Sequence, residues 1–207
     1  MKELKFEIIK EEELDECGGI VARAFENYEY ISNYISNTEK RKKFVSVCMP
    51  IELKVNKRAI RFVAKEGGTS VAVATLFPPG VSRVNDIEYI KAGFAKAFVY
   101  GGVIDVNAWV NMDKKASAPC HSLDKDVWYL NLITVDPSCQ GRGIGSSFIN
   151  ECIVPYIREH GGKKLSLFTN SEINKTFYFK NKFEEFDYRE FFYKRRRLPS
   201  YSLIRDL

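Results

Sequence analysis

Apolar and polar positions along the first part of the chain predict a strand followed by two helices. Residues 4–9 alternate between apolar and polar, which is typical of a half-buried strand. Apolar residues then recur at helical spacing from Leu14 to Phe25. A second helix is expected from about Glu39 to Val55, with Asn37 or Thr38 as its N-cap.

The middle of the chain predicts a hairpin and then more helix. Residues 59–65 and 70–77 alternate and are rich in β-branched residues, and the two glycines between them suit a tight turn. Helical spacing returns over 85–99 and, more weakly, over 103–112. The stretch 113–125 is expected to be an exposed loop.

The last third predicts a strand, helix, strand unit, formed by 127–135, 143–160 and 164–168. The remaining elements expected are a short helix near 173–180 and a final hairpin built from 183–193 and 200–204. Strands mixed with helices predict an α/β fold. No linker or repeat divides the chain, so we expect a single domain over 1–207.

Composition excludes several classes of function. The first ten residues alternate charged and apolar residues, without the apolar run of a signal peptide or membrane span, so we expect a cytoplasmic protein with no membrane contact. The five cysteines are odd in number and form no C-x-x-C pair, which favours reduced thiols and no metal site. The net charge of +5 is modest and the basic run 194–197 has no interleaved aromatics, so we expect no nucleic-acid partner.

Candidate chemistry is concentrated in the stretch 135–146. Gly141, Gly143 and Gly145 follow a predicted strand and open a predicted helix, where free N–H groups and the helix dipole favour an anion. Arg142 can add a charge-assisted hydrogen bond, which suits a diphosphate. The pattern lacks the Gly-Lys-Ser/Thr ending of a P-loop and the dinucleotide fingerprint, so ATP, GTP and NAD are disfavoured. A glycine-rich turn that binds nothing would have the same composition.

The motif Gln140-x-x-Gly-x-Gly after a strand resembles the coenzyme A pyrophosphate loop of the GNAT N-acetyltransferase family. The spacing of Asn174 and Tyr178 resembles the helix that follows in that family, and 71–80 resembles the strand and Pro-Gly stop of its puromycin-type members. The resemblance is strongest over 128–192. It implies a three-layer fold in which helices flank a central, mostly antiparallel sheet that splays at the strand before the loop.

The resemblance also implies the cofactor, acetyl-CoA, and direct transfer of its acetyl group to a primary amine of a small molecule, with no metal. Tyr178 would protonate the leaving thiolate, and Asn174, one helical turn earlier, would bond to the pantetheine arm. A tyrosine that only packs on the cofactor and an asparagine that caps the helix are the alternatives. The matching cofactor-binding residues are Ile133, Thr134, Val135, Gln140, Gly141, Arg142, Gly143, Ile144, Gly145, Ser146 and Asn174.

The acceptor pocket is expected to combine acidic and aromatic side chains, because these suit a cationic amine. The candidates are Glu26, Tyr28, Glu29, Tyr30, Tyr34, Trp128 and Tyr129, each of which could equally be an ordinary surface or core residue.

Two positions depart from the family pattern. Asn131 stands where some relatives hold a carboxylate base, and Lys182 replaces the usual glycine after the Tyr178 helix. These departures motivate an alternative, a non-catalytic acyl-CoA sensor or interaction module. A monomer and a homodimer both remain open.

Overall fold

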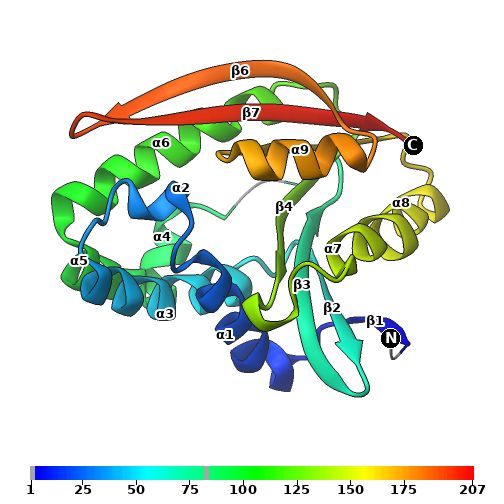
Figure 1. The fold of residues 1–207 in the computed structure, drawn as a ribbon, viewed down its shortest axis with the longest axis horizontal. Helices are drawn as coiled ribbons and strands as arrows, with labels where there is room; N and C mark the ends of the chain where they lie inside the picture. The colour runs from blue at the N-terminus through cyan, green and yellow to red at the C-terminus, as the bar shows by residue number, and fades with distance from the viewer. Residues whose placement is uncertain (1–2, 82–83) are drawn as a thin grey trace.

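One seven-stranded sheet organises the computed structural model, which describes residues 3–81 and 84–207 (Figure 1). The strands are β1 (Leu4–Ile8), β2 (Ile60–Glu66), β3 (Thr69–Phe77), β4 (Val127–Val135), β5 (Lys164–Thr169), β6 (Glu184–Tyr193) and β7 (Arg196–Asp206). Their order is β1-β2-β3-β4-β5-β7-β6, and every neighbouring pair is antiparallel except β4 with β5. The mostly antiparallel sheet expected from the sequence is confirmed.

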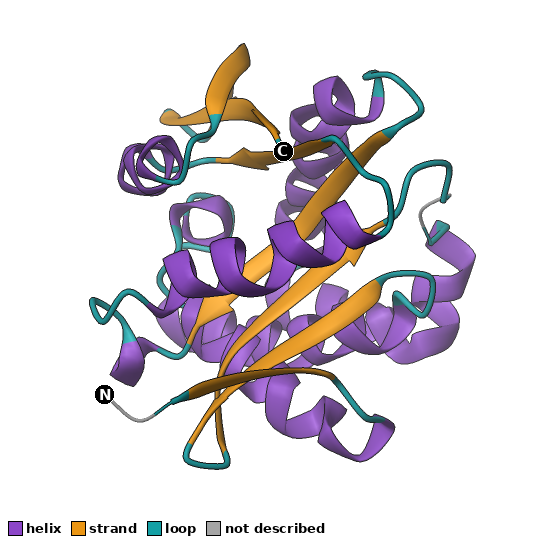
Figure 2. Ribbon diagram, turned by 90° about the vertical axis from the view of Figure 1, so that its right-hand side faces the viewer, coloured by secondary structure: helices purple, strands orange, loops and turns teal. Residues whose placement is uncertain are grey.

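Helices cover both faces of this sheet (Figure 2). They are η1 (Glu11–Glu13), α1 (Leu14–Phe25), α2 (Glu29–Ser32), α3 (Thr38–Val55), α4 (Asp86–Tyr89), η2 (Ile90–Phe94), α5 (Ala95–Gly101), α6 (Val103–His121), η3 (Pro137–Cys139), α7 (Ile144–Ser147), η4 (Phe148–Ile153), α8 (Val154–Glu159) and α9 (Glu172–Lys180). Within the two described ranges, no helix combines the length and apolarity needed to cross a bilayer.

The two large hydrophobic cores of the described residues, one on each face, give the fold three layers; a third cluster is small. Helices α1, α3, α5 and α6 form the first core, and α7, η4, α8 and α9 form the second. Successive residues of a strand point to opposite faces, so in β3 Val73 belongs to the first core, whereas Ala72 and Ala74 belong to the second. Helix α9 lies along the β6–β7 hairpin (Figure 1).

The sheet opens between β4 and β5. These two strands pair only where Val127–Tyr129 meets residues 164–166. Beyond that point β4 stays paired with β3 to its end, while β5 continues with β7. The pairing of β4 with β3 skips Asn131, which makes this residue a β-bulge at the start of the opening. One edge of β4, over residues 130–135, therefore faces a gap in the sheet.

Helix α6 extends through most of the segment 113–125, so the prediction of a loop there was wrong. The helix continues to His121 and buries Ala116, Ser117 and Cys120. These are small residues, and a face made of small side chains gives a weak apolar periodicity. The sequence pattern therefore understated the length of this helix.

The basic run at the C-terminal end forms the turn of the β6–β7 hairpin. Lys194 and Arg195 have φ of 46° and 65°, as a two-residue type I′ turn requires. Lys194 pairs with Asp105 at 2.6 Å, and Arg197 pairs with Glu190. Strand β7 begins at residue 196, four residues earlier than the pattern predicted, because this turn is so tight.

Candidate active site

The glycine loop after β4 leads directly into the helix formed by α7, η4 and α8. Gly143 has φ of 80°, a left-handed conformation that favours glycine, and it is the N-cap of this helix. The N–H of Ser147 donates to the carbonyl oxygen of Gly143 at 3.0 Å and is the first donor within the helix. The N–H groups of residues 144–146 precede that donor, so they have no acceptor inside the helix. A helix start of this kind favours an anion.

The loop is packed against α9, the helix that carries Asn174 and Tyr178. A Cβ atom added to Gly145 would lie 3.2 Å from Cζ of Phe177, so glycine permits the close approach of the two helices. The Ser146 hydroxyl accepts a hydrogen bond from Nδ2 of Asn181 at 3.1 Å. The two parts of the predicted site are thereby held together.

Two loop side chains bond to the protein itself. Gln140 donates from Nε2 to the carbonyl oxygen of Val135 at 3.1 Å, so it braces the loop. The Arg142 guanidinium donates to the carboxylate of Glu66, at the end of β2, and this hydrogen bond raises the pKa of Arg142. The Arg142 side chain is 37% exposed, which leaves it free to turn toward a ligand at the loop.

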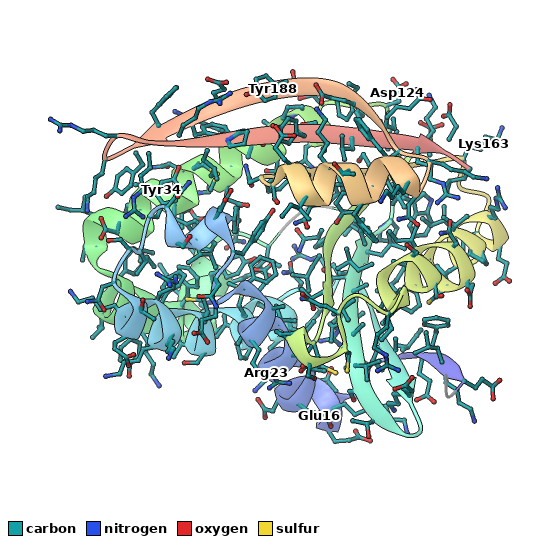
Figure 3. All side chains as sticks on the ribbon, in the orientation of Figure 1. Glu16, Arg23, Tyr34, Asp124, Lys163 and Tyr188 are labelled. Atoms are coloured by element: carbon teal, nitrogen blue, oxygen red, sulfur yellow. The ribbon has the colours of Figure 1, made fainter. Side chains whose placement is uncertain are left out.

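Asp136 fixes the exit from β4 and was missed by the sequence reasoning. Its carboxylate accepts hydrogen bonds from the Ser138 N–H at 3.0 Å and from Nε of Arg23, on α1, at 3.0 Å. Arg23 lies beside this loop in Figure 3. Burial opposes ionisation of Asp136, yet these hydrogen bonds hold the pKa of its carboxyl below the usual value.

The open edge of β4 suits an extended ligand arm. Ile133, Thr134 and Val135 pair with β3 on one side, and the backbone groups of alternate residues in an antiparallel strand point to the other side. The Thr134 hydroxyl is buried and has no hydrogen-bond partner among the described residues. An arm that pairs with this edge like an added strand would therefore meet unpaired backbone and side-chain groups. The pantetheine arm of coenzyme A fits that description.

Tyr178 lies in the second core, where its ring contacts Phe177 and Phe183 at centroid distances of 5.1 and 5.4 Å. Burial raises the pKa of Tyr178, so the phenol stays protonated near neutral pH. The Tyr28 hydroxyl lies 3.0 Å from the Thr169 hydroxyl and accepts a hydrogen bond from the Asn170 N–H at 3.0 Å. Asn174 and the phenol of Tyr178 are close enough to that hydroxyl to influence its pKa or be influenced by it. Asn174 and Tyr178 are thus gathered around Tyr28.

Lys182 ends α9 in the way that a glycine would. Its φ is 65°, its N–H donates to the carbonyl of Phe179 at 3.0 Å, and the Phe183 N–H donates to the carbonyl of Tyr178 at 3.1 Å. This pair of bonds is the Schellman motif, in which glycine is the common residue. The turn after Tyr178 is therefore formed despite the substitution.

A cavity of about 630 Å³ lies next to the bulge of β4. Its lining includes Phe25, Tyr28, Tyr30, Met49, Glu52, Asn56, Phe77, Val84, Asp86, Tyr89, Ile90, Phe94, Phe98, Asn107, Trp109, Val110, Asn111, Asp113, Lys114, Asn131, Leu132 and Phe168. Aromatic rings and three carboxylates dominate this lining. Asp86 is paired with Lys114 at 2.9 Å, and Asp113 accepts from the Tyr30 hydroxyl at 2.5 Å. Such surroundings suit a cationic guest.

Tyr28 and Tyr30 are the two predicted acceptor residues that line this cavity, and Tyr178 lies outside its lining. The other five predicted acceptor residues lie elsewhere: Tyr34 stacks on Tyr193 near the turn of the β6–β7 hairpin (Figure 3), Tyr129 contacts His121, Trp128 packs on Tyr156, Glu26 pairs with Lys42, and Glu29 begins α2.

Sequence reasoning missed Glu52, Tyr89 and Asp113, which come from α3, α4 and α6. A signal for Glu52 was present. It follows the buried Cys48 by four positions and therefore lies on the apolar face of α3, where a charged side chain is rare.

Comparisons with known proteins agree with this geometry. The model of the "Acetyltransferase (GNAT) family" matches residues 26–180. A search of curated proteins found no significant match. Solved structures of acetyltransferases have similar folds, and three of them illustrate the likeness. A Corynebacterium glutamicum protein described as histone acetyltransferase HPA2 and related acetyltransferase has TM-score 0.66 and 14% identity, over 99% of this chain and 96% of that one. The PaiA N-acetyltransferase of Thermoplasma acidophilum, in complex with coenzyme A, has TM-score 0.58 and 10% identity, and the match covers 99% of both chains. The Drosophila melanogaster polyamine N-acetyltransferase has TM-score 0.61 and 14% identity, and the match covers 99% of this chain and 100% of that one.

Proposed function

Because this chain belongs to the GNAT acetyltransferase family, we propose that it transfers the acetyl group of acetyl-CoA directly to a primary amine of a small cationic molecule. One observation carries the proposal: the glycine loop, the open edge of β4 and an acidic, aromatic cavity follow one another along a single strand. The pyrophosphate would then bind at the loop, the thioester arm along the open edge and the acceptor in the cavity.

Residues of this chain would hold acetyl-CoA at two points. The N–H groups of the 141–146 loop would bind the pyrophosphate, and Arg142 would join them after leaving Glu66. The open edge at 133–135 would pair with the pantetheine arm. When bound, acetyl-CoA supplies an activated thioester at the edge of the cavity.

Tyr178 would donate a proton to the leaving thiolate. Its phenol is protonated at neutral pH. The leaving thiolate, whose conjugate acid has a pKa of about 8.5, is basic enough to accept that proton. Asn174 would bond to the pantetheine arm, because it lies one helical turn before Tyr178 on α9 and close to the Tyr28 hydroxyl.

A cationic acceptor is supported by the side chains of the cavity. Glu52 and Asp113 place negative charge among aromatic rings, which attract ammonium groups through their faces. Proteins of similar fold include an agmatine N-acetyltransferase and the Drosophila enzyme, described as forming N-acetylagmatine. At identities of 14–15% these neighbours share the fold, so the acceptor class rests on the cavity.

The test is release of free thiol from acetyl-CoA in the presence of agmatine, spermidine, tyramine, phenylethylamine, a lysine peptide and a peptide with N-terminal alanine. We expect turnover of the small amines, with N-acetylated product by mass spectrometry. For the peptides we expect kcat/KM to be lower by roughly tenfold or more, because the cavity lining can surround a small amine whereas most of a peptide would lie outside it. Coenzyme A binding without turnover of any amine would support a non-catalytic module instead. Preference for a peptide would refute a small-molecule acceptor.

A further inference from the structure

Three donors among the described residues, from the C-cap of α3, from α4 and from β4, bond to one carboxylate of the cavity. Oε1 of Glu52 accepts from Nδ2 of Asn131, on β4, at 3.2 Å and from Nδ2 of Asn56, the C-cap of α3, at 2.6 Å. Oε2 accepts from the hydroxyl of Tyr89, on α4, at 2.5 Å. Donors on both oxygens fix the orientation of the carboxylate.

The contact with Asn131 places Glu52 at a particular point of the site. Asn131 is the bulge residue at which β4 leaves β5, and the open edge at 133–135 begins two residues later. Asn131 and Glu52 also line the same cavity. Glu52 therefore lies where an acceptor in the cavity would meet a thioester on the open edge.

The other two acidic residues of the cavity lack this placement. Asp86 forms an ion pair with Lys114 at 2.9 Å, a contact directed to α6 rather than to the strand. Asp113 is on α6 and accepts from the Tyr30 hydroxyl, a contact directed to α2 rather than to the strand. Of the three carboxylates, Glu52 has a hydrogen bond to the strand that would carry the thioester arm.

We propose that Glu52 removes the proton from the acceptor ammonium, an inference that rests on the proposed acetyl transfer. Oε of Glu52 takes one proton from R–NH₃⁺ and leaves the neutral amine. The amine nitrogen bonds to the thioester carbonyl carbon, and the C–S bond breaks. The second proton leaves that nitrogen and ends on the thiol sulfur, while the proton on Glu52 returns to solvent. One ammonium and one thioester thus give one amide, one thiol and one released proton.

Several titratable groups face Glu52. Among the described residues these are Cys48 on its own helix, Tyr89 on α4, and Tyr30 with its partner Asp113. Burial and the nearby carboxylate raise the pKa of Tyr89, so this phenol remains a donor and acts as a positioning residue. The thiol of Cys48 also has its pKa raised by burial, so it stays neutral.

Glu52→Gln keeps the shape of the side chain and removes the base. The probe is whichever of agmatine, spermidine, tyramine and phenylethylamine the wild-type protein acetylates fastest, or agmatine if none is acetylated. We expect kcat/KM near neutral pH to fall roughly 100-fold, with the affinity for coenzyme A unchanged. The variant can use only the fraction of amine that is already unprotonated in solution. Its kcat/KM should therefore rise about tenfold per pH unit below the pKa of the amine, which is about 10, while the wild-type profile is flatter.

A second readout is independent of turnover. Calorimetric binding of the same probe without acetyl-CoA should weaken about tenfold in Glu52→Gln, because a charge-assisted bond to the ammonium is lost. Glu52→Asp should restore part of the activity and the flatter profile. Glu39→Gln, on the surface of the same helix beside Lys42, is the matched control and should behave as wild type.

Two results would overturn the assignment while leaving acetyl transfer intact: turnover of Glu52→Gln within about twofold of wild type, or a deficit that does not change with pH. Absence of wild-type turnover with every amine would instead remove the proposed function. In that case unchanged agmatine affinity in Glu52→Gln would also remove any role for this carboxylate in holding the ammonium.

Discussion

Glu66→Gln should make coenzyme A bind more tightly, because Arg142 must leave Glu66 before it can reach a phosphate. The side chains of Arg142 and Glu66 are 37% and 15% exposed, so water weakens their attraction and the pair holds Arg142 only modestly. Breaking a surface pair of this kind corresponds to a factor of about two to five in a dissociation constant. Isothermal calorimetry with coenzyme A in low-salt buffer should show a tightening of that size.

A double-mutant cycle separates this competition from a general effect of charge. Arg142→Gln should weaken binding roughly tenfold, because one charge-assisted hydrogen bond to phosphate is lost. In the Arg142→Gln background, Glu66→Gln should have no further effect, since no guanidinium remains to be released. Glu16→Gln, at an exposed position of α1, is the control for net charge. Equal tightening by Glu66→Gln in both backgrounds, or weaker binding in the single variant, would refute the reasoning.

Three further changes have defined outcomes. Tyr178→Phe should lower kcat by about 100-fold with the affinity for coenzyme A near wild type; unchanged kcat in steady-state thiol release would remove this phenol from the mechanism. Tyr89→Phe removes the hydroxyl that orients Oε2 of Glu52, so kcat/KM should fall roughly tenfold while the affinity for coenzyme A stays near wild type; unchanged kcat/KM would contradict this. Lys182→Gly should stabilise the protein by about 1 kcal/mol, because glycine relieves the positive φ, and raise Tm in calorimetry by roughly 2–4 °C; a lower Tm would contradict this.

The sequence pattern predicted those features that depend on residues close together in the chain, such as a helix and its cap. The helix expected from about Glu39 to Val55, with Asn37 or Thr38 as its cap, is observed as α3. Asn37 is the cap, and its side chain accepts from the N–H of Lys40 at 3.0 Å. The glycine loop could be read as well, because positive φ and close approach restrict the sequence directly. A local requirement on the backbone restricts which residue types can occupy those positions, so it can be recognised in the sequence.

The acceptor cavity could not be read in the same way, because its wall is assembled from helices far apart in the chain. Glu52 and Tyr89 are 37 residues apart, and their contact depends on how α4 packs on α3. Tyr34, by contrast, is near Tyr28 in the sequence but turns away to stack on Tyr193. Sequence neighbourhood is a poor guide to such a pocket, whereas a carboxylate on an apolar helix face, as at Glu52, is a usable signal.

Amide hydrogen exchange with and without coenzyme A tests most directly the claim that β4 and its glycine loop hold the cofactor. The N–H groups of residues 133–135 and 141–146 should become protected when coenzyme A binds, because they gain acceptors in the arm and the pyrophosphate. Unchanged exchange in both segments, with protection appearing in another part of the molecule, would contradict the account.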